Sequence, residues 1–335
     1  PIDVRTDRAL NQLQEELRAK PKHYSIYCQL SGIDTIKTPL MFGVVQFAML
    51  KGDEFQDYQN VVAGGDLSEE DKAECLLFLD KHVMAPLMGK TVSTIQVQAV
   101  DSDAAIDYAL GQLRFTLDII NFLINAISPS TPSYVRLFEG DISAMSHILA
   151  YSLEQTPTVN SHYRRNPGTI DVSLEKIIGS QNNNELQQQK ISTWLSNSNR
   201  TDFANALLTS MKWAGRAAST PFAHEAFLHY AIALESLMLE KENAQELSYR
   251  LKLRIAHLLG KDVDHKRNLF DAVNKIYQER SRIVHNGQHN ISDVDLQMLR
   301  YITHQCIRRL LTDAEFEGMN SRTELFNWLQ ERILS

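Results

Sequence analysis

The sequence predicts an α+β N-terminal domain followed by an all-α helical bundle. Residues 1–179 mix alternating apolar segments with helical ones, whereas residues 200–335 have almost only helical periodicity. A length of 335 residues fits two domains of about 100–200 residues each. Residues 180–199 are rich in Asn, Gln and Ser, and we interpret them as a polar linker that contains one short helix.

The composition is that of a soluble globular protein. Hydrophobic residues make up 43% and charged residues 22%, which excludes a disordered or fibrous chain. The longest apolar segment, residues 115–124, is interrupted by Asp118 and Asn121 and is too short to span a membrane. Residues 1–22 are polar, without the apolar core of a secretory signal. We therefore expect a cytoplasmic protein with no membrane partner.

The distribution of charge and the positions of the cysteines exclude further classes of function. Residues 1–199 carry 16 basic and 24 acidic side chains, and residues 200–335 carry 18 and 17. The acidic N-terminal part argues against general polyanion binding there, and leaves room for a local basic cleft in the C-terminal part. The three cysteines, Cys28, Cys75 and Cys306, lie far apart and are expected to be small buried residues rather than disulfides or metal ligands.

In the N-terminal part, strands and helices are expected to be mixed. The strands expected from β-forming residues and alternation are 23–31, 91–100 and 133–138. The expected helices are 9–19, 68–88 and 104–127. Ser68 is expected to cap the second helix, and Ser102 or Asp103 the third. Residues 40–50 fit either a strand or a buried helix, because so short an apolar run does not distinguish them.

In the C-terminal part, six helices are expected. They are residues 202–217, 224–240, 244–259, 267–285, 293–311 and 323–334. Gly260 and Gly287 are expected to end the third and fourth of these helices.

An arginine occupies a core-facing position on the fourth helix. Its apolar stripe is Leu269, Val273, Ile276 and Val284, and Arg280 takes the place between the last two. Because an isolated buried charge costs several kcal/mol, this guanidinium is expected to be paired, or to line an interface or a cleft.

His285 follows Arg280 by five residues at the end of the same helix. The two lie about 140° apart around the helix and about 7.5 Å apart along it, so they would not touch directly but could flank one phosphate-sized gap, especially one completed by a second copy of the chain. Ser281 shares a face with His285, and its hydroxyl can orient the imidazole. The helix C-terminus favours a positively charged imidazole and hence an acid or phosphate-binding role. A solvated arginine and a capping histidine would have the same spacing.

Glu235 is the second charge on an apolar helix. Residues 224–240 are apolar nearly all round, so this carboxylate is expected to have a cationic partner. Arg280 and Arg254 are the candidates, and an edge position that reaches water is the alternative.

These residues resemble a HEPN domain (higher eukaryotes and prokaryotes nucleotide-binding) of the ApeA-like kind. In that family a late helix carries Arg, a polar residue, three variable residues and His, which here are Arg280, Ser281, residues 282–284 and His285. The sequences flanking this motif and two upstream helices are similar as well. They are Ile276-Tyr277, Asn286-Gly287, Ala233-Leu234-Glu235-Ser236-Leu237 and Arg254-Ile255-Ala256. The resemblance covers residues 200–335.

The resemblance implies a metal-independent endoribonuclease with no cofactor, which acts on RNA as a homodimer or higher homo-oligomer. In the mechanism usually proposed for the family, the ribose 2′-hydroxyl attacks its own phosphodiester. By analogy, Arg280 would stabilise the phosphorane oxygens, His285 would transfer a proton or orient the phosphate, and Ser281 would support His285. The other residues to which the resemblance points in supporting roles are Glu235, Tyr277, Arg282 and Asn286.

The resemblance also implies a biological setting. Proteins of this kind often act in antiviral (phage) defence or as toxins. The domain of residues 1–179 would then sense or regulate, and a trigger or an antitoxin would be a partner. Some HEPN proteins are instead non-catalytic modules for nucleotide or RNA binding or for dimerisation, and this is the alternative.

Three other patterns, taken as functional motifs, give weaker support or none. His224 and His229 are five residues apart, whereas a helical zinc-protease pair needs four. Neither a P-loop nor a dinucleotide-binding glycine motif occurs. The cluster at residues 162–165 (His-Tyr-Arg-Arg) has the chemistry to contact phosphate or stack on a base, but a solvated loop is expected there.

Overall fold

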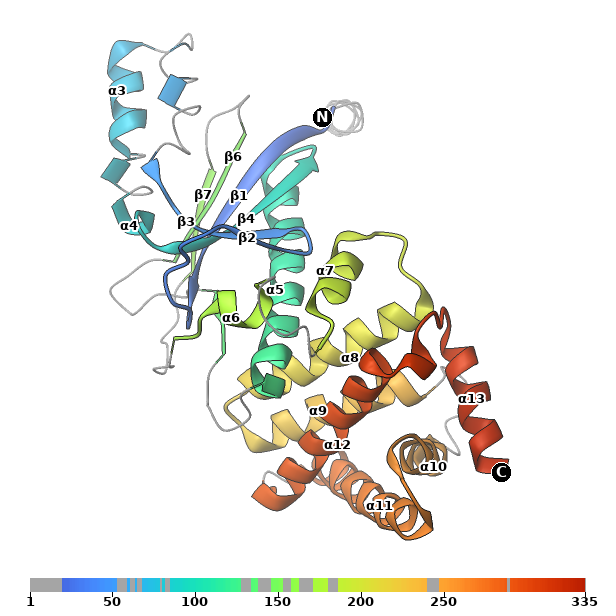
Figure 1. The fold of residues 1–335 in the computed structure, drawn as a ribbon. Coiled ribbons are helices and arrows are strands. Elements are labelled where there is room, and N and C mark those ends of the chain that lie inside the picture. The colour runs from blue at the N-terminus through green and yellow to red at the C-terminus, as the bar shows by residue number, and fades with distance from the viewer. Residues whose placement is uncertain are drawn as a thin grey trace, which may run out of the picture. The chain divides into compact units, whose positions relative to one another are not determined.

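The chain is represented by a computed structural model (Figure 1), which divides into two compact units. The described residues are 20–52, 59–60, 64, 68–78, 80–81, 85–127, 134–137, 146–152, 158–162, 171–179, 186–239, 247–287 and 290–334. The sheet unit comprises residues 1–114 and 136–168, and the helical unit residues 115–135 and 169–335. The predicted order, an α+β part followed by a helical part, is confirmed. A linker at residues 180–199 remains a prediction.

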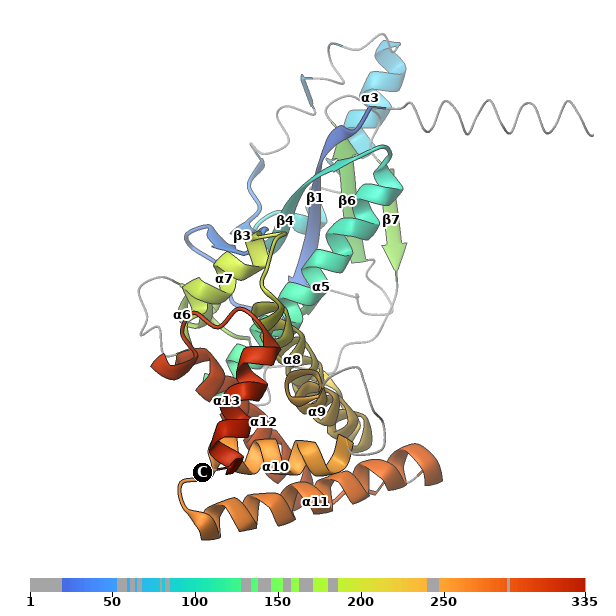
Figure 2. The ribbon, with the colours of Figure 1, turned by 90° about the vertical axis from the view of Figure 1, so that its right-hand side faces the viewer.

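Among the described residues, the sheet unit is built on seven antiparallel strands. They are β1 (Lys22–Ser31), β2 (Leu40–Phe42), β3 (Val45–Met49), β4 (Thr91–Ala99), β5 (Arg136–Leu137), β6 (Ser146–Ser152) and β7 (Thr158–His162). The order is β2-β3-β4-β1-β6-β7, and β5 pairs with the end of β1. The strand β1 is central, with Ile26 opposite Ile95 of β4 and Ala150 of β6. Figure 2 shows β1, β4 and β6 side by side.

Residues 40–50 form a hairpin rather than one strand or a helix. Phe42 pairs with Val45, so the connection is the two-residue turn Gly43-Val44. Gly43 has a φ of 64°, a left-handed conformation that glycine adopts without strain. The apolar run conceals this turn, since glycine is the one residue in it that signals a break.

The helices of the sheet unit begin close to the predicted positions. The helix α3 (Glu69–Phe78) is capped by Ser68, whose Oγ accepts from the Asp71 amide at 3.1 Å. The predicted helix to residue 88 is not one element, because a separate short helix, α4 (Ala85–Leu87), follows it. The predicted helix at residues 9–19 lies outside the described residues.

The long helix α5 (Ser102–Ile127) belongs to both units. Its cap is Asp101, which accepts from the Ala104 amide at 2.7 Å, and not Ser102 or Asp103 as predicted. Asp101 holds this position because the helix begins two residues earlier than expected. Residues 102–114 are assigned to the sheet unit and residues 115–127 to the helical unit.

The helical unit contains the remaining helices, close to the predicted ranges. They are α6 (Leu174–Ile178), α7 (Gln188–Ser196), α8 (Asp202–Ser219), α9 (Ala223–Met238), α10 (Leu247–Leu259), α11 (Val263–Asn286), α12 (Asp293–Thr312), the 3-10 turn η4 (Ala314–Phe316) and α13 (Arg322–Leu334). The predicted short helix in residues 180–199 is α7, whose Ile191 and Leu195 are buried. Helices α8 and α9 pack side by side, as do α10 and α11 (Figures 1 and 2).

The close approach of α5 and α8 depends on one glycine. A side chain at Gly215 would collide with the backbone of Asp118 and Phe122. With hydrogen at this position, the two helices pack backbone against backbone, and Arg216 next to it reaches Asp118. Phe122, which is fully buried, lies at this crossing.

Candidate active site

The predicted motif lies in the last two turns of α11, whose ends are defined by caps. Asp262 accepts from the His265 amide at 2.8 Å, so the helix begins four residues before the predicted start. Gly287 ends it with a φ of 64°, and its amide donates to the carbonyl of Arg282. The sequence prediction of a glycine stop immediately after His285 and Asn286 is confirmed.

The buried line of α11 passes Arg280 but does not end where predicted. Its buried residues are Leu269, Val273, Ile276 and Ile283. Val284, which the predicted stripe included, is 49% exposed. The helix turns once every 3.6 residues, so a position seven residues after Ile276 returns to its face, and a position eight residues after it has rotated past the core. Arg280 lies between Ile276 and Ile283, with 32% of its side chain exposed.

Arg280 is paired with Glu235 of α9. The Arg280 Nε lies 3.4 Å from the Glu235 Oε1, and 24% of the glutamate side chain is exposed. The same oxygen accepts a hydrogen bond from the Tyr277 hydroxyl at 2.7 Å. Arg254, the other candidate partner, instead lies over the ring of Phe326 at 3.7 Å. The expectation that the carboxylate on this apolar helix has a cationic partner is therefore confirmed, with Arg280 as that partner.

Tyr277 holds its proton in this arrangement. Burial, together with the Glu235 carboxylate, raises the pKa of the Tyr277 phenol far above its ordinary value. The hydroxyl is thus a permanent donor to Glu235, and it fixes the carboxylate that faces Arg280. The guanidinium is approached through Nε, and its planar fork carries further donors on the two terminal nitrogens.

The other predicted site residues lie on the exposed end of α11. Ser281, Arg282, His285 and Asn286 are all exposed. Arg282 pairs with Glu279 of the preceding turn at 2.5 Å. No hydrogen bond joins Ser281 and His285, both of which the structure describes. The single chain therefore presents His285 to solvent, about a turn and a half beyond the anchored Arg280.

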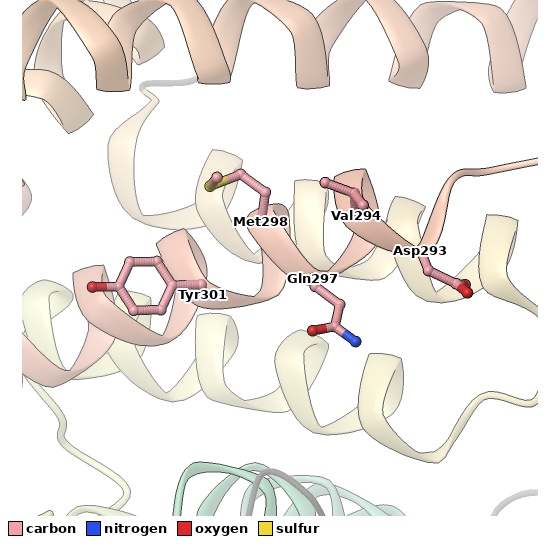
Figure 3. Close-up of a pocket in the computed structure, with 5 residues that line it drawn as sticks. All are labelled: Asp293, Val294, Gln297, Met298 and Tyr301. Atoms are coloured by element: carbon pink, nitrogen blue, oxygen red, sulfur yellow. The ribbon is translucent and has the colours of Figure 1, made fainter.

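A feature that sequence reasoning missed is an apolar face on α12. Val294, Met298 and Tyr301 are 73%, 43% and 59% exposed, and we call them the α12 apolar face. With Asp293 and Gln297 they line a pocket, in which Val294 and Met298 project to the same side of the helix (Figure 3). The sequence signal for this face is the spacing of four and three residues, which places the three side chains on one side of the helix. The buried residues Leu299 and Ile302 lie on the other side.

The described residues also bear on the motifs set aside. They contain no group of three or more His, Cys, Asp or Glu side chains placed to hold a metal ion. None of the helices they form is long and apolar enough to cross a membrane. Cys28 and Cys306 are buried, as expected, whereas Cys75 is half-buried. Of the basic and aromatic cluster, residues 163–165 lie outside the described part.

No protein-family model matches the chain, and no significant match was found among curated proteins or solved structures.

Proposed function

We propose that the protein is a metal-independent endoribonuclease of the HEPN type, with Arg280 and His285 as its catalytic residues. The observation that carries the proposal is the anchored arginine. A guanidinium on the core-facing line of α11, held through Nε by Glu235, keeps its terminal nitrogens for a phosphate, and His285 follows at the helix end. A merely solvated arginine would have neither the half-buried position nor the carboxylate and tyrosine behind it.

The proposed reaction is an intramolecular transesterification of the RNA strand. The ribose 2′-oxygen forms a bond to the adjacent phosphorus and loses its proton, and the bond to the 5′-oxygen breaks. The products are a 2′,3′-cyclic phosphate and a 5′-hydroxyl. Arg280 stabilises the additional negative charge of the phosphorane. His285 transfers a proton, and Ser281 supports it where RNA or a second copy brings the groups together.

Glu235 and Tyr277 are positioning residues in this proposal. They hold Arg280 and do not touch the substrate, while Arg282 and Asn286 border the site. Because Arg280 and His285 of one chain are well separated, a homodimer or larger homo-oligomer would complete the cleft from two α11 helices. We further propose a cytoplasmic role in phage defence or as a toxin, with the sheet unit responding to a trigger or an antitoxin.

The α12 apolar face supports a second candidate function. Large apolar side chains that are exposed on one helix face favour a protein interface. In this alternative the helical unit is a non-catalytic module for dimerisation or for RNA or nucleotide binding. Arg280 then stabilises assembly rather than a transition state.

The deciding experiment is cleavage of labelled single-stranded RNA in the presence of EDTA, with the chain mass measured by light scattering. Wild type is compared with Arg280→Ala and His285→Ala. Arg267→Ala is the matched control, because it removes an exposed guanidinium from the same helix, 13 residues before Arg280. We expect both site variants to keep their mass and to lose at least a hundredfold in rate, because His285→Ala removes the proton-transfer group and Arg280→Ala removes the group that stabilises the phosphorane. Loss of assembly in Arg280→Ala, without cleavage by the wild type, would support the binding module instead.

A further inference from the structure

Five side chains of α5, α8, α9 and the α8–α9 connection gather around the indole of Trp213 in the helical unit. Together with the indole we call them the Trp213 cluster, and they are Asp118, Lys212, Arg216, Thr220 and His229. The Arg216 guanidinium carbon, the Lys212 ammonium and the His229 ring lie 5.1, 5.7 and 5.4 Å from the indole centroid. None of these residues belongs to the α11 site.

The hydrogen bonds of Thr220 determine which nitrogen of His229 is protonated. The single hydroxyl proton is donated to the carbonyl of Arg216 at 2.6 Å. In its 3.2 Å contact with His229 Nδ1 the Thr220 oxygen must therefore accept, which places the ring proton on Nδ1. Nε2 is left with its lone pair, as an acceptor for a hydroxyl or amine of a ligand.

The two cations of the cluster, Arg216 and Lys212, have donor groups that form no hydrogen bond within the described part of the chain. Arg216 donates from Nε to the Asp118 Oδ2 at 2.7 Å, with 37% of its side chain exposed. The contacts in the described part of the chain engage neither of its terminal nitrogens. Lys212 lies between the rings of Trp213 and Phe115. Both are half-exposed donors that lie within about 6 Å of the centre of the Trp213 ring.

The balance of charge limits what the cluster can bind. Lys212 and Arg216 exceed Asp118 by one positive charge, and the exposed Glu225 near His229 brings the net charge to zero. A ligand with one negative charge is therefore tolerated better than a doubly charged phosphate monoester. A phosphodiester carries one negative charge, and a ribose unit adds the hydroxyl donor that His229 Nε2 lacks.

We propose that the Trp213 cluster binds a ribonucleotide unit of single-stranded RNA. Lys212 and Arg216 contact its phosphodiester, and the 2′-hydroxyl donates to His229 Nε2. The base packs against the exposed part of Trp213, since aromatic side chains stack on unpaired bases. The inference rests on the proposed function in taking RNA as the substrate class, and it assigns a second contact with that strand outside the α11 site.

The ionisation of the cluster agrees with this role. Burial lowers the pKa of His229, and the neighbouring Arg216 adds to that effect, so the imidazole is neutral and can accept. Burial also lowers the pKa of Lys212 and raises the pKa of Asp118.

The test compares binding of RNA and DNA oligonucleotides of one sequence by fluorescence anisotropy. Every protein is the full chain carrying Arg280→Ala, in EDTA, so that no strand is cut. His229→Phe keeps a ring against Trp213 but removes Nε2. Loss of one hydrogen bond should weaken RNA binding about fivefold and leave DNA binding unchanged. Unchanged DNA binding also shows that this variant is folded.

A charge variant tests the phosphate contact. Lys212→Gln should weaken RNA and DNA binding alike and reduce the salt slope by about 0.7. Lys190→Gln is the matched control, because Lys190 lies 5.2 Å from Trp194 in a similar cation–aromatic pair without the Arg and His. Equal affinities for RNA and DNA, an RNA preference that survives His229→Phe, or equal effects of the two lysine variants would each overturn the proposal. Failure of the ribonuclease proposal would appear in the cleavage assay and leave these binding ratios unaffected.

Discussion

Acid should weaken the helical unit through one buried histidine. His304 of α12 packs against Phe122 and Tyr230, with ring centroids 5.0 and 6.1 Å away. Its Nε2 is buried and has no hydrogen-bond partner among the described residues. Burial lowers the pKa of His304 from 6.5 to about 3, and the nearby Arg300 adds to the effect.

The sign and size of the effect follow from proton linkage. The unfolded chain binds a proton at this histidine below pH 6.5 and the folded chain does not, so folding stability falls as the pH drops. With the two pKa values, about 2 kcal/mol of unfolding free energy is lost between pH 7 and pH 5. For a unit of this size that loss lowers the unfolding temperature by roughly 4–8 °C.

The assay is thermal unfolding at pH 7 and pH 5, for wild type and His304→Phe. The variant keeps an aromatic ring against Phe122 and cannot be protonated at this position. Because all other titrating groups are the same in the two proteins, their contributions cancel when the two losses of unfolding temperature are compared. We expect its loss of unfolding temperature between the two pH values to be smaller than that of the wild type by the amount above. Equal losses in the two proteins would refute the assignment of acid sensitivity to His304.

The remaining predictions concern the site and one helix crossing. Glu235→Gln removes the charge that holds Arg280 and should lower the cleavage rate about tenfold with little change in unfolding temperature, and an unchanged rate would show that the carboxylate does not position the guanidinium. Gly215→Ala should destabilise the protein by about 1–3 kcal/mol, because its Cβ meets the Asp118 backbone. Gly111→Ala, on the exposed part of α5 with nothing within 4 Å, should instead stabilise it by about 0.5–1 kcal/mol. Equal unfolding temperatures for these two alanine variants would contradict the close crossing of α5 and α8.

Sequence patterns predicted most of the elements because each pattern is local. Alternation placed β1 and β4 to within a residue, and the Gly287 signal placed the end of α11. The partner of Glu235 was also within reach, since two opposite charges on apolar faces each need compensation. In both cases the information lies in one helix or strand and its spacing.

What the patterns missed depends on contacts between distant segments. Arg216 and Asp118 are 98 residues apart, and neither lies in a motif that points to the other. The same holds for the Trp213 cluster, whose members come from three helices and one connection. The burial of Ile283 instead of Val284 was missed for a different reason. Two successive steps of four residues, from Ile276 through Arg280 to Val284, carry the stripe about 80° past the buried face, to which a step of seven residues returns.

Because helix α5 belongs to both units, it limits which gene segments could encode a complete helical unit. The helical unit is not one continuous stretch, because residues 115–135 belong to it and residues 136–168 do not. A gene segment that began at residue 200 would encode Arg216 without Asp118 and His304 without Phe122. The helical unit is therefore interrupted in sequence, and an exchange of this unit between genes would have to carry the second half of α5 along with the C-terminal helices.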